Sequence, residues 1–123
     1  MQAISFKISL MMEVELETEV EEWIDSLTDA NYATLLVQID RLERMGAAIR
    51  EPWSKSLGDG LYELRFDIDR VAWRIAYFAP NGRAVLLTIF RKQRNNERHE
   101  VQRARQAMRR CIADHEHGER NEP

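Results

Sequence analysis

The sequence predicts an α+β fold in which helices pack on one face of an antiparallel sheet. Three observations carry this prediction. Apolar and polar residues alternate over residues 4–16, apolar residues recur at helical spacing over 19–45, and three strand-like segments follow between residues 61 and 90. A last segment with helical spacing begins near Glu97. The expected order is therefore a strand, two helices, three strands and a C-terminal helix.

The N-terminal segment has the pattern of a half-buried strand. Every second residue from Ile4 to Leu16 is apolar, and the residues between them are polar or acidic with the exception of Met11. Successive side chains of a strand point to opposite faces, which gives this period of two. We expect one long strand or two short ones here, with the acidic residues facing water.

Two helices are expected next, over about 19–45. Thr18 and Glu21 have the spacing of a capping box, which predicts a helix start. Thr28 offers a second N-cap, and Gly46 follows the last apolar position as a C-cap. Because the break between the two helices is short, we expect them to lie antiparallel.

Three strands are expected after a loop over 47–60. They span residues 61–66, 71–79 and 84–90, and their links are short and polar. The second link contains Asn81 and Gly82, a pair that readily adopts the positive φ angles of a hairpin turn. Connections of this length predict an antiparallel meander.

The alternation of side chains places two arginines on one face of this meander. The bulky residues of the first two strands share the other face, which is the natural partner of the helices. Arg65 and Arg74 are then expected on the uncovered face, beside the small side chains of Ala72 and Ala76. Such guanidinium groups match the geometry of phosphate. The alternative is that they form surface ion pairs with carboxylates such as Glu63.

The composition excludes several classes of protein. A single cysteine, Cys111, excludes an internal disulfide framework, and with three histidines it makes a poor zinc-binding set. The apolar runs are too short to cross a bilayer, and no secretion signal is recognisable at the N-terminus. We expect a single cytoplasmic domain over residues 1–123 without a metal or other cofactor, with a core over about 12–112 and a polar tail over 113–123.

The charge is divided unevenly along the chain. Residues 1–60 hold 5 basic and 12 acidic side chains, whereas residues 61–123 hold 13 basic and 9 acidic ones, for a net charge of −3. This asymmetry indicates that the C-terminal half meets an anionic partner. Arginine-rich helices that are merely well solvated would give the same count.

Three segments, in order, resemble a known family. They read GLYELR at 60–65, WRIAY at 73–77 and LLTIFRK at 86–92. This set, followed by an amphipathic helix, is similar to the RelE/ParE toxin superfamily, and closest to its phage-derived HigB-like branch. The resemblance covers about residues 12–112.

The resemblance implies the toxin of a type II toxin–antitoxin system, with a helix-turn-helix antitoxin as partner. RelE-like and HigB-like toxins cleave mRNA on the ribosome without a metal, by attack of a ribose 2′-hydroxyl on the adjacent phosphate. The basic positions of the family correspond to Arg65, Arg74 and Lys92, which are the expected catalytic residues. Further cations follow the third strand and are expected to bind RNA or the ribosome; these are Arg91, Arg94 and Arg98.

The sequence departs from the family pattern at the expected acid and base. Gln93 stands where relatives have a second lysine, and no tyrosine follows Tyr77. His99 and Glu63 are the candidates for proton transfer, since imidazole titrates near neutral pH. The alternatives are a solvated histidine on a helix surface and an ion-pair partner of Arg65.

Two other functions compete with RNA cleavage. A ParE-like toxin would act by binding gyrase, and a degenerate relative would bind only its antitoxin or nucleic acid. The clustered cations at Arg65, Arg74 and Lys92 favour the nuclease, because a toxin that binds a protein does not need them. The missing tyrosine and the net acidity leave the degenerate relative as an open alternative.

Overall fold

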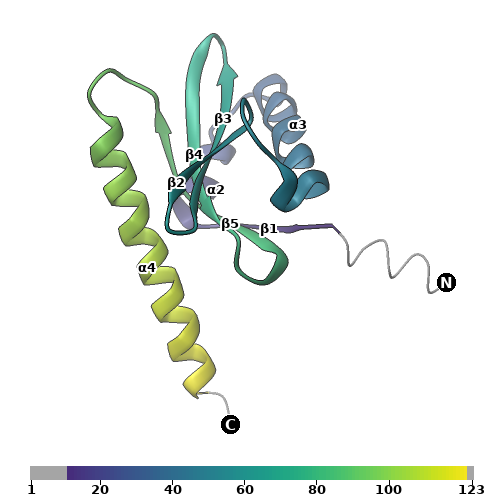
Figure 1. The fold of residues 1–123 in the computed structure, drawn as a ribbon. Coiled ribbons are helices and arrows are strands. Elements are labelled where there is room, and N and C mark those ends of the chain that lie inside the picture. Colours follow the sequence, from purple (N-terminus) through teal and green to yellow (C-terminus); the bar gives the residue numbers. More distant parts are fainter. Residues whose placement is uncertain (1–10, 122–123) are drawn as a thin grey trace, which may run out of the picture.

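The computed structural model describes residues 11–121, and side chains over residues 11–115 (Figure 1). Three α-helices and five strands make up the described chain, together with two short 3₁₀ turns. In chain order they are β1 (Glu13–Leu16), α2 (Thr18–Asp25), α3 (Asp29–Met45), η1 (Gly46–Ala48), β2 (Ser54–Gly58), β3 (Leu61–Ile68), β4 (Val71–Phe78), η2 (Pro80–Gly82), β5 (Arg83–Arg91) and α4 (Glu97–Asn121).

The strands form a single mixed sheet in the order β1-β5-β4-β3-β2. The antiparallel meander β3-β4-β5 is present, and its second turn has the predicted positive φ angles at Asn81 and Gly82. The sheet is larger than predicted, because β2 adds a strand at one edge and β1 pairs in parallel with β5 at the other. An all-antiparallel sheet was therefore the wrong expectation.

Strand β2 lies in the segment that was expected to be a loop. Its hairpin with β3 turns through Gly58, Asp59 and Gly60, all of which have positive φ angles. Two glycines supply this conformation at little steric cost. The loop prediction was correct for the turn and wrong for Ser54–Gly58, whose sequence SKSLG has too little apolar periodicity to reveal a strand.

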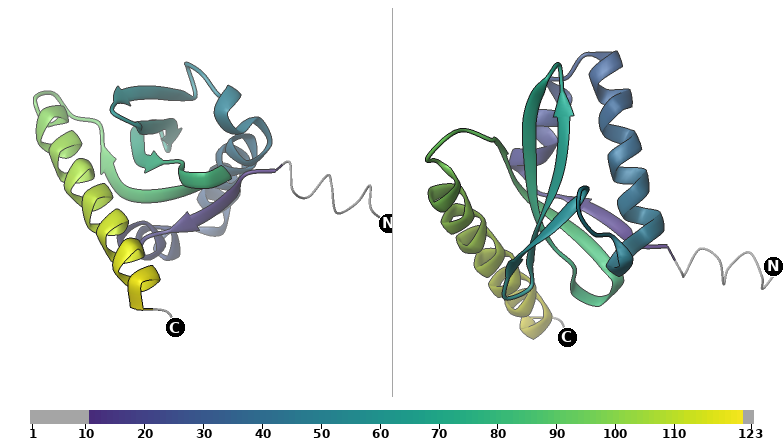
Figure 2. Two further views of the ribbon diagram at one scale, coloured as in Figure 1. Left: turned by 60° about the horizontal axis from the view of Figure 1, so that its bottom comes forward. Right: turned by 45° about the horizontal axis from the view of Figure 1, so that its top comes forward.

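Helices cover both faces of the sheet, not one face (Figures 1 and 2). Helices α2 and α3 pack on one face, and α4 packs on β4 and β5 from the other. The second face is apolar where α4 lies, because Leu61, Ala76 and Phe78 are buried there together with Ala104 of the helix. Burial of this apolar surface explains why α4 docks against it.

Helices α2 and α3 are present within the predicted range, and they pack on different strands of the sheet. Helix α2 packs mainly on β5, and α3 packs on β3 and β1. Thr28 caps α3 by accepting a hydrogen bond from the Asn31 amide at 3.2 Å, as predicted. The capping box at Thr18 is wrong, since α2 begins at Thr18 and Glu17 occupies the N-cap without a side-chain hydrogen bond.

Two expectations concern the ends of the described chain. The predicted strand over residues 4–16 is described from residue 11 onward, where Glu13–Leu16 is a strand, and residues 4–10 lie outside the described part of the chain. At the other end α4 continues to Asn121, so the segment expected as a polar tail from residue 113 is helical as far as the structure describes it.

Side chains hold α4 against the edge of the sheet. The Arg103 guanidinium donates hydrogen bonds to the Glu19 carboxylate and, at 3.1 Å, to the carbonyl oxygen of Ile89. The other oxygen of Glu19 accepts from the amide of Ile89 at 2.9 Å. Asn96 donates to the carbonyl of Arg91, at 3.1 Å. These contacts join α2, β5 and the start of α4.

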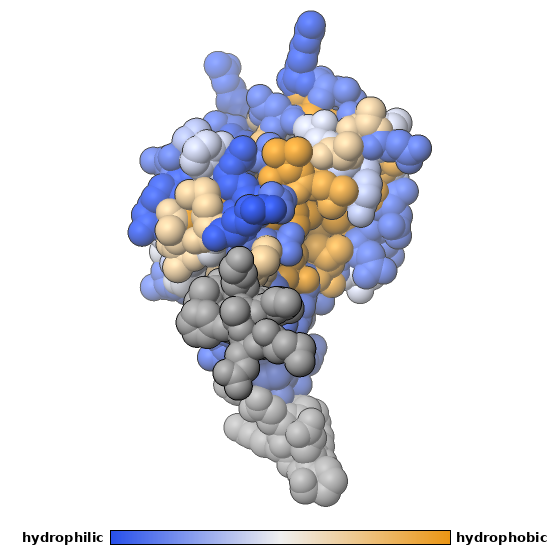
Figure 3. Space-filling view, turned by 90° about the vertical axis from the view of Figure 1, so that its right-hand side faces the viewer, coloured by the Kyte–Doolittle hydropathy of each residue, from blue (hydrophilic) through white to orange (hydrophobic). Residues whose placement is uncertain are grey.

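The surface on the side of α3 is partly apolar. Figure 3 shows apolar side chains gathered on this side of the molecule. Helix α3 carries several large apolar residues that are exposed, namely Tyr32, Leu36, Val37 and Met45. None of the helices within residues 11–121 is both long and apolar enough to span a membrane.

Candidate functional site

The two predicted arginines lie side by side in the sheet. Arg65 of β3 and Arg74 of β4 are directly opposite each other in the antiparallel register. Their side chains share one face of the sheet, as the alternation predicted, and this is the face on which α4 packs. Glu63 lies two residues before Arg65 on the same face, so three charged groups meet at one place.

The carboxylate of Glu63 lies between the two guanidinium groups. Its Oε1 is 3.7 Å from Nε of Arg65 and 3.9 Å from Nε of Arg74. Glu63 is 0% exposed, and neither of its side-chain oxygens has a hydrogen-bond partner. Burial raises the pKa of Glu63 and the Glu97 carboxylate raises it further, while Arg74 and Arg65 act in the opposite direction.

The sheet face at Arg74 is not open, which corrects the sequence-based expectation. Arg74 is only 7% exposed, and its Nη1 donates to the carbonyl oxygen of Trp73 at 2.9 Å. Burial lowers the pKa of Arg74, and the neighbouring Arg65 lowers it further. The expectation was wrong because α4 covers much of this face.

Both arginines nevertheless line a pocket, at the edge of β3. Beyond its pairing with β2 this strand continues past Arg65, and a pocket of about 340 Å³ opens beside it. Its wall combines the β3–β4 hairpin, the segment before β2 and one residue of α3; it consists of Gln38, Pro52, Trp53, Arg65, Phe66, Asp67 and Arg74. The volume is at the lower end of the range for pockets that bind small ligands.

Trp53 forms an exposed wall of this pocket. The indole is 37% exposed, and the guanidinium carbon of Arg41 lies 4.4 Å from its ring centroid. A tryptophan at such a position can cover the edge of a core or stack on a nucleic-acid base. Gln38 and Asp67 were not predicted, because they become neighbours of Trp53 only when α3 and the β3 edge pack together.

The other predicted residues lie along the connection from β5 to α4. Lys92 follows β5, and its amide donates to the carbonyl oxygen of Ala72, two residues from Arg74. The side chains in this connection are exposed and do not line the pocket; they are Arg91, Lys92, Arg94, Arg98 and His99. The structure thus brings Arg65, Arg74 and Glu63 into contact, places Lys92 beside them in the sheet register, and leaves His99 on the surface of α4.

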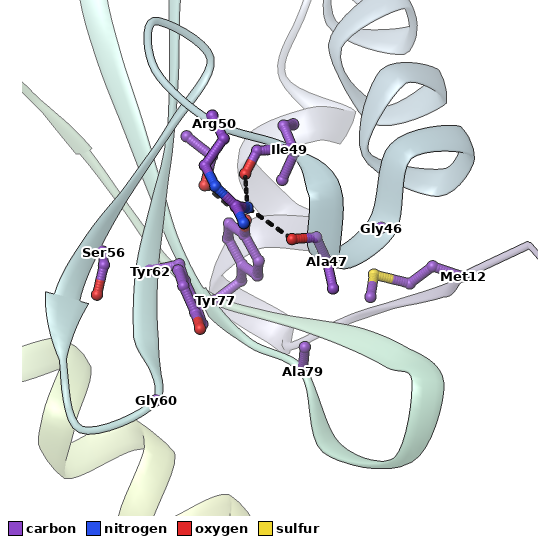
Figure 4. Close-up of a pocket in the computed structure, with 11 residues that line it drawn as sticks. Met12, Gly46, Ala47, Ile49, Arg50, Ser56, Gly60, Tyr62, Tyr77 and Ala79 are labelled. Atoms are coloured by element: carbon purple, nitrogen blue, oxygen red, sulfur yellow. Dashed lines mark hydrogen bonds between the residues drawn. The ribbon is translucent and has the colours of Figure 1, made fainter.

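A second pocket, of about 440 Å³, lies against the sheet face that carries α3 (Figure 4). Tyr62 and Tyr77 stack in its wall with ring centroids 5.6 Å apart, and the hydroxyl of Tyr77 is 2.7 Å from that of Ser54. Its arginine, Arg50, donates to the carbonyl oxygens of Ala47 and Ile49. The paired cations therefore belong to the other pocket.

The described residues show neither a metal site nor a reactive cysteine. Within the part of the chain that the structure describes, no group of three or more histidine, cysteine or acidic side chains is placed to hold a metal ion. Burial, with a further contribution from Glu17, raises the pKa of the Cys111 thiol to about 11. Since the thiolate is the nucleophile, Cys111 is unreactive near neutral pH.

The raised pKa of Glu63 predicts how stability depends on pH. The unfolded chain releases this proton near the ordinary pKa of 4.5, whereas the folded protein retains it to higher pH. The stabilisation by Glu63 is therefore complete below pH 4.5 and is lost as the pH rises through the raised value. The free energy of unfolding of Glu63→Gln, measured with denaturant, is therefore expected not to fall over this pH range.

Glu51→Gln is the control, because Glu51 is an exposed carboxylate that also pairs with Arg65. If the free energy of unfolding of wild type and of Glu63→Gln changed equally with pH, the prediction would be contradicted.

Comparison with known proteins places the chain in a family. No curated protein matches it. The profile of a protein family, described as phage derived protein Gp49-like (DUF891), matches residues 22–109. These residues include α3, the whole meander, both arginines of the pocket and the β5–α4 connection. The chain therefore belongs to the phage-derived Gp49-like family, which is part of the RelE/ParE-like toxin superfamily of type II toxin–antitoxin systems.

Proposed function

We propose that this protein is the toxin of a type II toxin–antitoxin system and inhibits translation by cutting mRNA on the ribosome. The observation that carries the proposal is the pair Arg65 and Arg74, directly opposite each other in the sheet and both lining one pocket. Family membership supports the toxin. The paired cations favour the nuclease among the toxins of the superfamily, because they suit a phosphate.

The proposed reaction transfers a phosphoryl group within the RNA chain. The 2′-oxygen forms a bond to the adjacent phosphorus while the bond from phosphorus to the 5′-oxygen breaks. One proton leaves the 2′-hydroxyl and another is delivered to the 5′-oxygen, giving a 2′,3′-cyclic phosphate and a 5′-hydroxyl. Negative charge grows on the phosphate oxygens, and Arg65, Arg74 and Lys92 are proposed to stabilise it.

The acid and base are proposed among two residues. Glu63 is fully buried, so it acts on the substrate only if the cover over it opens. Its contacts with Arg65 and Arg74 support the role of ion-pair partner that orients the guanidinium groups. His99 is exposed at the start of α4 and is accessible to a bound RNA.

The exposed cations of the β5–α4 connection are proposed to hold the substrate. Arg91, Arg94 and Arg98 lie within eight residues of one another, next to Lys92. Arginines in this arrangement bind successive phosphates of mRNA or ribosomal RNA without reading the sequence. This assignment explains why the C-terminal half is basic in a chain whose net charge is −3.

An antitoxin of the helix-turn-helix class is the proposed partner, and the cytoplasm, where ribosomes are found, is the proposed location. A neutralising partner must cover or distort the toxin, and apolar surface on α3 is available for contact with a protein. The proposal expects a small helix-turn-helix reading frame next to the gene. Copurification of the two proteins from a joint expression strain would test the pairing.

Expression of the protein without a partner is expected to arrest bacterial growth and to produce new 5′ ends within translated messages. Mapping of mRNA 5′ ends after induction measures this result, and an Arg74→Ala strain at equal soluble expression is the control. Growth arrest with intact mRNA and gyrase-dependent DNA breaks would instead identify a ParE-like toxin. Normal growth at high soluble expression would identify a degenerate relative.

A further inference from the structure

We infer that the pocket beside Trp53 is a subsite for one ribonucleotide, with the phosphate on Arg65 and Arg74 and the base against the indole. The inference rests on the proposed function, because it names how that site holds its substrate. It goes further in assigning Trp53, Asp67 and Gln38 to recognition of the base. Four features of the pocket support it: paired cations, an exposed aromatic wall, an acidic acceptor and an amide donor.

The phosphate position follows from the two arginines. Both arginines line the pocket; on the buried side they share the Glu63 carboxylate, and on the outer side Arg65 contacts the exposed carboxylate of Glu51, at 3.4 Å. A contact this long with a solvated group is weak. A phosphate therefore displaces Glu51 at small cost and gains charge-assisted hydrogen bonds from Arg65 and Arg74.

The base position follows from Trp53. An indole that only covered a core edge would be buried, whereas this one is 37% exposed and lines the pocket. Arg41 lies over the ring but does not line the pocket, so the cation leaves the pocket side of the indole free. Two hydrogen bonds fix the backbone of Trp53. Its amide donates to the carbonyl oxygen of Arg50, and its carbonyl oxygen accepts from the Arg65 amide at 2.8 Å. Unstacked RNA bases are commonly bound on aromatic side chains fixed in this way.

The identity of the base follows from Asp67 and Gln38. Asp67 lies close enough to Arg74 to raise the pKa of that guanidinium, against the larger effect of burial, and its carboxylate accepts hydrogen bonds. The oxygen of Gln38 already accepts from Arg41 at 2.7 Å, which leaves its amide N–H groups to donate. Guanine presents two adjacent N–H donors beside a carbonyl acceptor on one edge. This pattern complements Asp67 and Gln38, whereas adenine offers no carbonyl.

The test is binding of guanosine 3′-monophosphate to the purified protein, followed by the NMR shift of the Trp53 indole N–H. Trp53→Ala is expected to weaken binding about 5- to 150-fold, which corresponds to the free energy of stacking one base. Trp53→Phe keeps an aromatic surface and is expected to retain most of the affinity. Tyr62→Ala, which removes an exposed aromatic residue from the other pocket, is the matched control and is expected to bind normally.

A separate variant, Asp67→Asn, tests the preference for guanine. The wild type is expected to bind guanosine 3′-monophosphate more tightly than adenosine 3′-monophosphate, and Asp67→Asn is expected to remove most of this difference. Equal binding of the two nucleotides by the wild type would overturn the guanine assignment. The subsite itself would be overturned if guanosine 3′-monophosphate left the NMR signal of the Trp53 indole N–H unshifted. It would also be overturned if Trp53→Ala bound the nucleotide as tightly as the wild type.

The outcomes separate the subsite from the proposed function. If the protein cuts mRNA but the nucleotide does not bind beside Trp53, the subsite is wrong and the nuclease stands. If the nucleotide binds there and depends on Trp53, but induced cells keep their mRNA intact, the subsite stands and the proposed function fails.

Discussion

Replacement of Arg74 by alanine is expected to lower the rate of RNA cleavage by about two to three decades. That is the usual cost of removing one group that stabilises charge in a transition state. Single-turnover cleavage of a ribosome-bound message would measure it. Arg83→Ala is the control, because Arg83 is also a sheet arginine in an ion pair, with Glu15, but lies outside the pocket.

The burial of Arg74 requires a second variant in this experiment. Its removal leaves the Glu63 carboxylate with one cation fewer in a buried site, and a buried charge without its partner is destabilising. The double variant Glu63→Gln/Arg74→Ala avoids this charge and is compared with Glu63→Gln alone. A folded double variant that cuts as fast as Glu63→Gln would show that Arg74 has no part in catalysis.

Charge reversal at Arg94 and Arg98 is expected to weaken binding to RNA and to reduce its dependence on salt. Each phosphate contact on single-stranded RNA contributes about 0.7 to the slope of log K against log salt concentration, so two lost contacts reduce the slope by about 1.4. Between about 50 and 200 mM salt, the affinity of the double variant should therefore change about sevenfold less than that of the wild type.

Arg109 and Arg110 provide the matched control for this reversal. They are also exposed and also lie on α4, about three turns beyond Arg98. Their reversal changes the net charge equally but removes no contact near the pocket. An equal loss of slope in both double variants would mean that total charge, and not the β5–α4 connection, governs binding.

The sequence predicted the parts of the fold that depend on neighbouring residues. The turn at Asn81 and Gly82 is set by local backbone preferences, and the shared face of Arg65 and Arg74 is set by alternation within two paired strands. Both expectations were correct because short links leave little choice of pairing. Neither needed information from distant parts of the chain.

The missed features all depend on contacts between distant segments. The parallel pairing of β1 with β5 joins residues 13–16 to 83–86, and no local pattern encodes it. Helix α4 was predicted as an amphipathic helix, but its sequence does not tell which sheet face the apolar stripe around Ala104 covers. Arg74 and Glu63 are buried on this same face, so the open face expected from the sequence is a closed one with a pocket at its edge.

The contacts of Glu19, Arg103 and Asn96 have a consequence for association between copies of the protein. Strand β5 extends beyond its partner β1, and the segment VLLTIF within it is uncharged and rich in residues that favour strands. Such a segment at a free sheet edge is a template for intermolecular pairing and aggregation. Here side chains occupy both backbone groups of Ile89 and the carbonyl of Arg91. The folded protein therefore withholds this edge from other chains, and aggregation through it requires that α2 and α4 first leave the sheet.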